Sequence, residues 1–320
     1  SDKGTLFKLF NRAITPMGKR MMKKWLMHPL LRKNDIESRL DSVDSLLQDI
    51  TLREQLEITF SKLPDLERML ARIHSRTIKV KDFEKVITAF ETIIELQDSL
   101  KNNDLKGDVS KYISSFPEGL VEAVKSWTNA FERQKAINEN IIVPQRGFDI
   151  EFDKSMDRIQ ELEDELMEIL MTYRKQFKCS NIQYKDSGKE IYTIEIPISA
   201  TKNVPSNWVQ MAANKTYKRY YSDEVRALAR SMAEAKEIHK TLEEDLKNRL
   251  CQKFDAHYNT IWMPTIQAIS NIDCLLAITR TSEYLGAPSC RPTIVDEVDS
   301  KTNTQLNRFL KFKSLRHPCF

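Results

Sequence analysis

The sequence predicts a mainly α-helical protein: a helical lever bundle with long antiparallel coiled-coil arms that carry a small antiparallel β clamp sheet at the tip. Three observations lead to this fold class. Only 7 of the 320 residues are glycine, about a third of the usual share. Proline is absent from residues 145–196 and 206–263. In both windows apolar residues recur three or four positions apart, which places them on one face of a helix.

The two arms are expected to be long helices. The first covers about residues 149–178, with an apolar stripe from Phe152 to Phe177. The second carries its stripe from Val225 to Ile261. At 1.5 Å per residue the arms are roughly 40 and 60 Å long, and because their stripes face one another they are expected to pack as an antiparallel coiled coil.

The segment between the arms changes to the period of a β-strand. Residues 190–196 alternate Tyr192, Ile194 and Ile196 on one face with other side chains on the opposite face, and residues 181–184 form the expected partner strand. Residues 186–188 supply the turn that joins them. Residues 208–213 and 217–221 are expected to form a second pair, joined by a turn at 214–216.

The chain on either side of this hairpin is expected to form a helical bundle and then a new domain. Glycine and proline divide the bundle into short helices. These breaks stand at Pro16, Pro29, Pro64, Gly107, Pro117 and Pro144. After residue 286, segments 293–298 and 309–313 are expected to be short strands. The predicted organisation is a first helical part at 1–148, an ascending helix with the β insert at 149–222, returning helices at 223–287 and the truncated start of a β-containing domain at 288–320.

Composition excludes several classes of function. Lys and Arg number 50 against 46 Asp and Glu, and the net charge of +4 is too small to indicate a nucleic-acid partner by itself. The five cysteines form no closely spaced pair, which disfavours a disulfide framework or a zinc site and favours a reducing compartment. The longest apolar run, residues 274–278, is too short to span a membrane.

No chemistry of its own is expected from this chain. The sequence contains no phosphate-binding G-x-x-x-x-G-K-[ST] loop and no histidine with a metal-ligand partner at helical spacing. We therefore expect neither catalytic residues nor a cofactor or metal here. Since Ser1 replaces an initiating methionine and Phe320 ends no recognisable element, we also expect a piece of a longer chain.

Local charge provides the one specific signal. Between residues 180 and 221 there are six cations and three anions, gathered around the two predicted turns. Such cations can meet phosphates without reading bases, although lysines also keep exposed edge strands soluble. The basic run at 19–24 is more typical of a solvent-facing helix surface. In an alternative interpretation, the chain is a coiled-coil scaffold whose sheet binds a protein partner through Trp208, Tyr217 and Tyr220.

Several motifs, taken in order, resemble those of the MutS family of DNA mismatch repair proteins. The similarity is strongest to the branch that supplies the larger subunit of a eukaryotic heterodimer. The motifs are Gly4-Thr5-Leu6, Thr15-Pro16-Met17-Gly18-Lys19-Arg20, Leu63-Pro64-Asp65-Leu66-Glu67-Arg68, Gly147-Phe148-Asp149, Tyr192 to Ile196, Lys218-Arg219-Tyr220 and Leu315-Arg316-His317-Pro318.

The resemblance implies that two levers carry a clamp that closes around duplex DNA, which contains the mismatch in the full complex. It also implies a second MutS homologue as heterodimer partner, ATP and Mg bound elsewhere in a parent ATPase, a nuclear location and no membrane. Carried over by position, the residues expected to contact the DNA backbone are Lys185, Ser187, Lys189, Asn214, Lys215, Thr216, Lys218 and Arg219.

Overall fold

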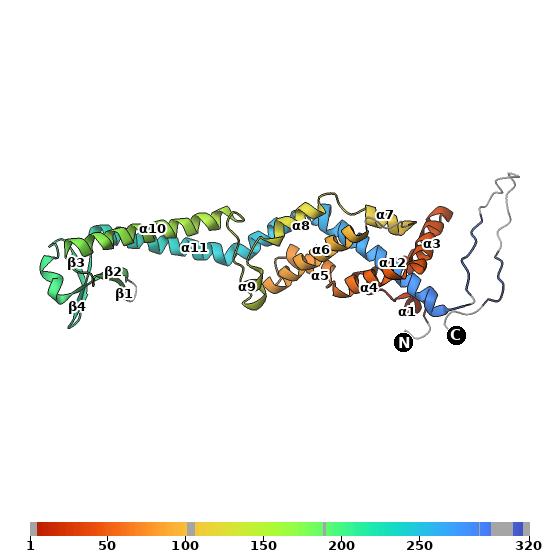
Figure 1. The fold of residues 1–320 in the computed structure, drawn as a ribbon, viewed down its shortest axis with the longest axis horizontal. Coiled ribbons are helices and arrows are strands. Elements are labelled where there is room, and N and C mark those ends of the chain that lie inside the picture. The colour runs from red at the N-terminus through yellow and green to blue at the C-terminus, as the bar shows by residue number, and fades with distance from the viewer. Residues whose placement is uncertain (1–4, 101–105, 188–189, 288, 296–309, 316–320) are drawn as a thin grey trace. The chain divides into compact units, whose positions relative to one another are not determined.

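The structure is a computed structural model that describes residues 5–100, 106–187, 190–287, 289–295 and 310–315. Within these residues the chain is mainly helical and carries a four-stranded antiparallel sheet, so the predicted fold class is confirmed (Figure 1). The chain divides into two compact units. We call Ser1–Val143 together with Leu250–Phe320 the helical unit, and Pro144–Arg249 the hairpin unit.

Among the described residues, the helical unit begins with nine helices, and each predicted break lies at or between helix boundaries. The helices that end at Gln48, His74 and Thr128 end where no break was predicted. Pro16 is the first residue of its helix, Pro64 separates two helices, and Gly107 and Pro117 flank another. The nine helices are α1 (Leu6–Phe10), α2 (Pro16–Met27), α3 (Lys33–Gln48), α4 (Ile50–Lys62), α5 (Leu66–His74), α6 (Val80–Leu100), α7 (Asp108–Ser114), α8 (Leu120–Thr128) and α9 (Arg133–Asn138).

The core of the helical unit forms around α12 (Met263–Leu285), the last helix described. It lies against α1, α2, α3, α5 and α7, and its residues 274–277 are fully buried. Tyr258–Leu285 is, among the described residues, the one segment long and apolar enough to cross a membrane, yet 72% of its most apolar window is buried inside the unit. Packing against the neighbouring helices therefore accounts for its composition.

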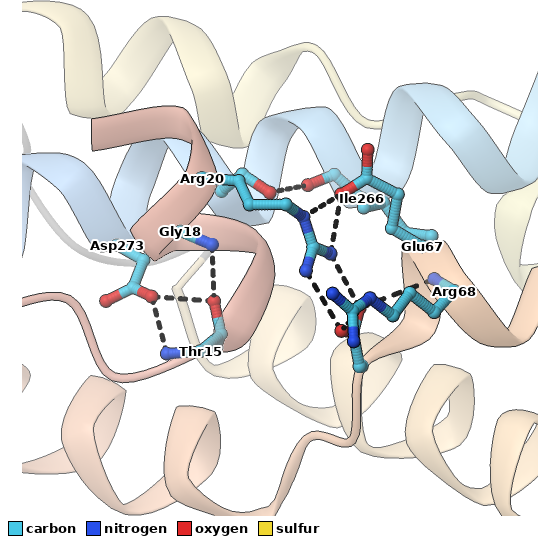
Figure 2. A network of polar contacts seen from close by, with 9 residues as sticks. Thr15, Gly18, Arg20, Glu67, Arg68, Ile266 and Asp273 are labelled. Carbon is cyan, nitrogen blue, oxygen red and sulfur yellow. Dashed lines mark hydrogen bonds and ion pairs between the residues drawn. The ribbon is translucent and has the colours of Figure 1, made fainter. Parts of the chain in front are cut away.

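A buried carboxylate fastens α12 to the start of α2 (Figure 2). Asp273 is fully buried and accepts hydrogen bonds from the Ile14 and Thr15 amides at 2.9 and 2.8 Å and from the Thr15 hydroxyl at 2.7 Å. The Thr15 hydroxyl in turn accepts from the Gly18 amide and caps α2. A Cβ at position 18 would lie 2.1 Å from the Asp273 carboxylate, so the contact requires glycine. Burial raises the pKa of Asp273, and the hydrogen bonds from Ile14 and Thr15 oppose that rise.

A second polar network joins α2 to the start of α5 (Figure 2). The Arg20 guanidinium contacts both oxygens of Asp65, at 2.6 and 2.9 Å, and its Nε donates to Glu67 at 2.8 Å. Asp65 also caps α5 by accepting from the Arg68 amide. The other three cations of the basic run, at positions 19, 23 and 24, are exposed, which confirms the predicted solvent-facing surface.

The hairpin unit consists of two helices and the sheet between them in sequence. Asp149 caps α10 (Ile150–Gln176), and the returning helix α11 (Asp223–Asp255) continues from this unit into the helical unit. Three contacts set their antiparallel pairing: Asp149 with Arg249 at 3.0 Å, Ser155 with His239 at 2.9 Å, and Tyr173 with Ser222 at 2.8 Å. The predicted antiparallel arms are thus observed.

The second arm is shorter than predicted. The expected stripe reaches Ile261, whereas α11 ends at Asp255 and a π-helical turn, η2 (Tyr258–Trp262), follows. The Trp262 indole N–H donates to the Phe254 carbonyl at 2.7 Å, and the two rings stack with centroids 4.3 Å apart. This contact takes a carbonyl from the last turn of α11, and a helix pattern alone does not reveal it.

The sheet has the strand order β1-β2-β4-β3, and all neighbours are antiparallel. Its elements are β1 (Gln183–Ser187), β2 (Glu190–Pro197), the 3₁₀ helix η1 (Ile198–Asn203), β3 (Val209–Ala213) and β4 (Tyr217–Tyr221). Ile194, Ile196 and Tyr220 pack with the apolar stripes of α10 and α11 in one buried cluster. One face of the sheet is therefore covered by the helical pair.

Past α12 the predicted strands are wrong for the residues that the structure describes. α12 ends at Gly286, whose φ of 65° suits glycine. Residues 293–295 and 310–313 contain no strand, because no described neighbour supplies the ladder of backbone hydrogen bonds that a strand requires. The remaining residues of those predictions, 296–298 and 309, lie outside the described ranges.

Replacing Asp273 by alanine tests the carboxylate that joins α12 to α2. The change leaves two buried amides and a hydroxyl without an acceptor, so we expect the free energy of unfolding to fall by roughly 2–4 kcal/mol. Urea denaturation of the 320-residue chain measures it. The matched control is Gln267→Ala on the exposed side of the same helix. Equal stability of the two variants would contradict the assigned role.

The contact between Arg20 and Asp65 predicts a dependence of stability on pH. The hydrogen bond from Arg20 lowers the pKa of Asp65 below its usual 3.8. The contact therefore stabilises the fold above about pH 4, and this stabilisation is lost as the pH falls through the lowered pKa.

In Asp65→Asn the helix cap is retained and the charge is lost. Arg20 is 38% exposed, so we expect the variant to be less stable at pH 7 by only about 1 kcal/mol. The difference should shrink as the pH falls to about 3. Glu118→Gln, at an exposed position, is the control. A difference that stays constant with pH would show that the charge has no part in it.

Candidate nucleic-acid interface

The two turns that carry the candidate residues lie at opposite ends of the sheet. β2 starts at the first turn, and its last residue, Pro197, pairs with Tyr217 beside the second turn. An eight-residue strand is about 25 Å long. The structure therefore separates the candidate residues into two groups, one towards each end of the sheet.

Asn214 builds the second turn. Its amide donates to the Tyr217 carbonyl at 2.9 Å. Its side-chain oxygen accepts from the Thr216 and Tyr217 amides at 2.9 and 2.6 Å and from the Thr216 hydroxyl at 3.1 Å. The carbonyl of Thr216 accepts from the Ile198 amide, which holds η1 against this end of the sheet. Asn214 and Thr216 thus shape the turn that presents the neighbouring lysines.

Cations surround this second turn. Lys215 is exposed and Lys218 is half-buried, and η1 adds the exposed Lys202. Among the described residues, none of the three forms an ion pair. Lys202 is counted among the cations of the sequence but was not among the candidate contacts, because only the contact between Ile198 and Thr216 places η1 beside this turn.

The strands on either side of the first turn, β1 and β2, contact the two helices. The Tyr184 hydroxyl donates to the Leu166 carbonyl of α10 at 2.8 Å, and Lys236 of α11 lies 5.4 Å from the Tyr192 ring. Tyr192 has a φ of 58°, unusual for an aromatic residue, and its amide donates to the Asp186 carboxylate at 2.9 Å.

Of the three candidates assigned to the first turn, Lys185 is exposed, lies in the middle of β1 opposite Thr193, and has no ion pair among the described residues. Ser187 is the last residue of β1, and its backbone pairs with Glu190. Lys189 lies outside the described residues. The structure therefore places one exposed candidate lysine on β1, before the first turn.

Arg219 differs from the lysines because an acid compensates it. Its Nε and Nη2 both lie 2.9 Å from one oxygen of Glu195, and the other oxygen accepts from Gln183 at 3.0 Å. The side chains of Glu195 and Arg219 are only 7% and 23% exposed. The hydrogen bond from Gln183 and the guanidinium of Arg219 lower the pKa of Glu195, so both groups are charged at neutral pH.

The predicted aromatic contact surface is used inside the hairpin unit. Tyr220 is buried, and the ring of Trp208 packs on Tyr173 and Phe177 with centroids 4.8 and 5.6 Å apart. Only Tyr217 of the three predicted residues stays outside this core, at a half-buried position. No specific observation therefore favours a protein-binding patch made of these residues.

Sequence comparison matches most of the chain to one protein family and to several known relatives. Residues 1–279 match the family MutS domain III. The whole chain is 31% identical to the DNA mismatch repair protein Msh6 of Gallus gallus and 30% identical to that of Homo sapiens, and it covers 26% and 25% of those proteins. It is 26% identical to the DNA mismatch repair protein MutS of Thermotoga neapolitana over 87% of the chain and 34% of that protein. The chain thus spans about a quarter to a third of these relatives.

Replacing Asn214 by alanine tests how the second turn is held. The change removes the acceptor of the Thr216 and Tyr217 amides, so we expect both amides to exchange with solvent roughly five to ten times faster. Hydrogen exchange followed by NMR measures this. Asn203→Ala, at an exposed position in η1, is the matched control and should leave both amides unchanged. Equal exchange in the two variants would contradict the turn geometry.

Proposed function

Because the chain belongs to the MutS family of DNA mismatch repair proteins, we propose that it is the lever and clamp region of such a protein. In this proposal the sheet binds the backbone of duplex DNA without sequence preference. The helices transmit ATP-driven conformational change to the sheet. The observation that carries the proposal is the presence of exposed lysines, in β1 and at the second turn, that form no ion pair among the described residues, on a sheet fixed to a helical pair.

The chemistry of these lysines supports contact with phosphate. A lysine ammonium without an acidic neighbour exchanges its bound anions for a DNA phosphate, and the release of counterions from DNA favours this association. Such contacts hold a protein on the duplex but carry no information about base order. Lys185 lies opposite Thr193, and Lys215 lies on the second turn beyond Pro197, at least four strand residues or about 13 Å further along β2. The two lysines would therefore meet different phosphates.

The helices are suited to transmit movement because they are fastened at specific points. In the hairpin unit, α10 and α11 are joined at both ends by the contact of Asp149 with Arg249 and that of Tyr173 with Ser222. In the helical unit, Asp273 and Arg20 tie α2 to α12 and α5. A displacement of one helix is thereby passed to its neighbour without bending either.

The remaining parts of the proposal concern the longer protein. The sequence of this chain contains no phosphate-binding loop, so ATP and Mg²⁺ would bind in another part of the protein, with ATP hydrolysis there as the source of the movement. The partner would be a second MutS homologue in a heterodimer that binds mismatch-containing duplex DNA in the nucleus.

The salt dependence of DNA binding tests the function. We expect the plot of log K against log salt concentration for the 320-residue chain to have a slope that becomes shallower by about 0.9 for each lysine removed from a phosphate contact. The triple variant Lys185→Gln, Lys215→Gln, Lys218→Gln should therefore lose up to about 2.7 of this slope. Fluorescence anisotropy with a labelled duplex of arbitrary sequence measures it.

The control is Lys154→Gln, an exposed lysine in the first turns of α10, which is the end of that helix away from the sheet. It should bind DNA with the slope of the unchanged chain. A triple variant that keeps that slope as well would remove both turns from DNA binding and contradict the proposed function.

A further inference from the structure

We propose that Arg219 is a positioning residue of the clamp sheet and not one of its phosphate contacts. In this proposal the ion pair with Glu195 makes the positive charge of Arg219 unavailable to DNA. This inference rests on the proposed function and revises the set of residues that perform it. Of the candidate cations that the structure describes, three then remain available to bind phosphate: the lysines at positions 185, 215 and 218.

The register of the sheet places Gln183, Glu195 and Arg219 side by side on three neighbouring strands. Gln183 pairs with Glu195 across β1 and β2, and Glu195 pairs with Arg219 across β2 and β4. The three side chains therefore form one row across three adjacent strands. Both oxygens of the Glu195 carboxylate are used within this row, one by Gln183 at 3.0 Å and the other by Arg219 at 2.9 Å.

Glu195 is almost fully buried, and few charged or polar groups face it. The charged and polar groups that face it are Gln183 and Lys185 from β1 and Arg219 from β4. Among the residues that the structure describes, Arg219 is the one cation that touches the carboxylate, through two N–H groups on the same oxygen. Because Glu195 is 7% exposed, its charge depends on this partner and is poorly hydrated by solvent.

To bind Arg219, a DNA phosphate would have to replace the Glu195 carboxylate as the partner of the guanidinium. Arg219 already contacts a carboxylate with the geometry that a phosphate oxygen would offer. Transfer of the guanidinium to DNA would exchange one anionic partner for another and leave Glu195 charged, buried and unpaired. The exchange brings no net gain in charge pairing, so Arg219 stays within the row and keeps β4 in register with β2.

Lys218, the neighbour of Arg219 in β4, is a cation of the same strand that lacks an acidic partner among the described residues. It points to the opposite face of the strand and pairs in register with the apolar Ile196. Two adjacent cations of the same strand are thus predicted to behave oppositely toward DNA.

The experiment compares salt slopes of DNA binding for two neutral variants. Glu195→Gln keeps the size and the acceptor oxygen of the side chain but removes its charge, so Arg219 becomes available to phosphate. We expect a slope steeper by about 0.9. If the two lines meet at 1 M salt, the variant binds DNA about eightfold more tightly than the unchanged chain at 0.1 M salt. If Glu195 acted only by holding the sheet together, its loss would weaken binding instead.

The double variant Glu195→Gln, Arg219→Gln removes both charges of the ion pair, so neither position keeps a charge without its partner. We expect it to bind DNA with the slope of the unchanged chain. A slope shallower by about 0.9 would show that Arg219 contacts phosphate and would overturn the inference. The double variant also decides the matter if Glu195→Gln alone proves unstable, since it contains no unpaired charge.

Lys218→Gln, at the adjacent position, separates this inference from the proposed function. It should lose about 0.9 of the slope. If Lys218→Gln and the triple lysine variant leave the slope unchanged, the proposed function fails. If they reduce it while Glu195→Gln leaves the slope at the value of the unchanged chain, only the inference about Glu195 and Arg219 fails.

Discussion

A single buried carboxylate holds the helical unit together. Asp273 lies in the middle of the most apolar helix of the chain and bonds to Thr15, a residue 258 positions earlier in the sequence. Its charge is tolerable there because two amides and a hydroxyl at the start of α2 donate to it. The contact also explains why Gly18 has no side chain, since a Cβ would collide with the carboxylate. The first helices are thereby fixed to α12, against which α3, α5 and α7 also pack.

The hairpin unit applies the same rule to a charged residue in a sheet. Glu195 lies at the centre of β2 and is stable there because Gln183 and Arg219 use both of its oxygens. The exposed lysines of the same sheet have no such partners among the described residues. The sheet therefore contains two kinds of cation, one that serves its structure and others that face solvent. Their separation by chemical environment matters more for DNA binding than the number of cations in the segment.

Much of the fold could be predicted because it depends on local rules. The apolar period of α10, the turn at Asn214 and the helix breaks at Pro64 and Pro117 each follow from a few neighbouring residues. The errors arose where the outcome depends on contacts that lie outside the regular helix or strand pattern. The indole of Trp262 takes a carbonyl from the last turn of α11, so that helix ends before Ile261. The short strands expected after α12 find no neighbouring strand among the described residues.

The sequence by itself determined the helical arms, the two β-hairpins between them and a family resemblance that the comparisons confirmed, because periodicity and turn chemistry are properties of adjacent residues. Only the tertiary structure decided how the hairpins join. A simple meander would place both turns at the same end of the sheet, whereas the pairing of β2 with β4 places them at opposite ends and brings Arg219 beside Glu195. Both arrangements satisfy the same alternation of side chains. The choice between them depends on packing against α10 and α11, which joins residues too far apart in sequence for any local pattern to show.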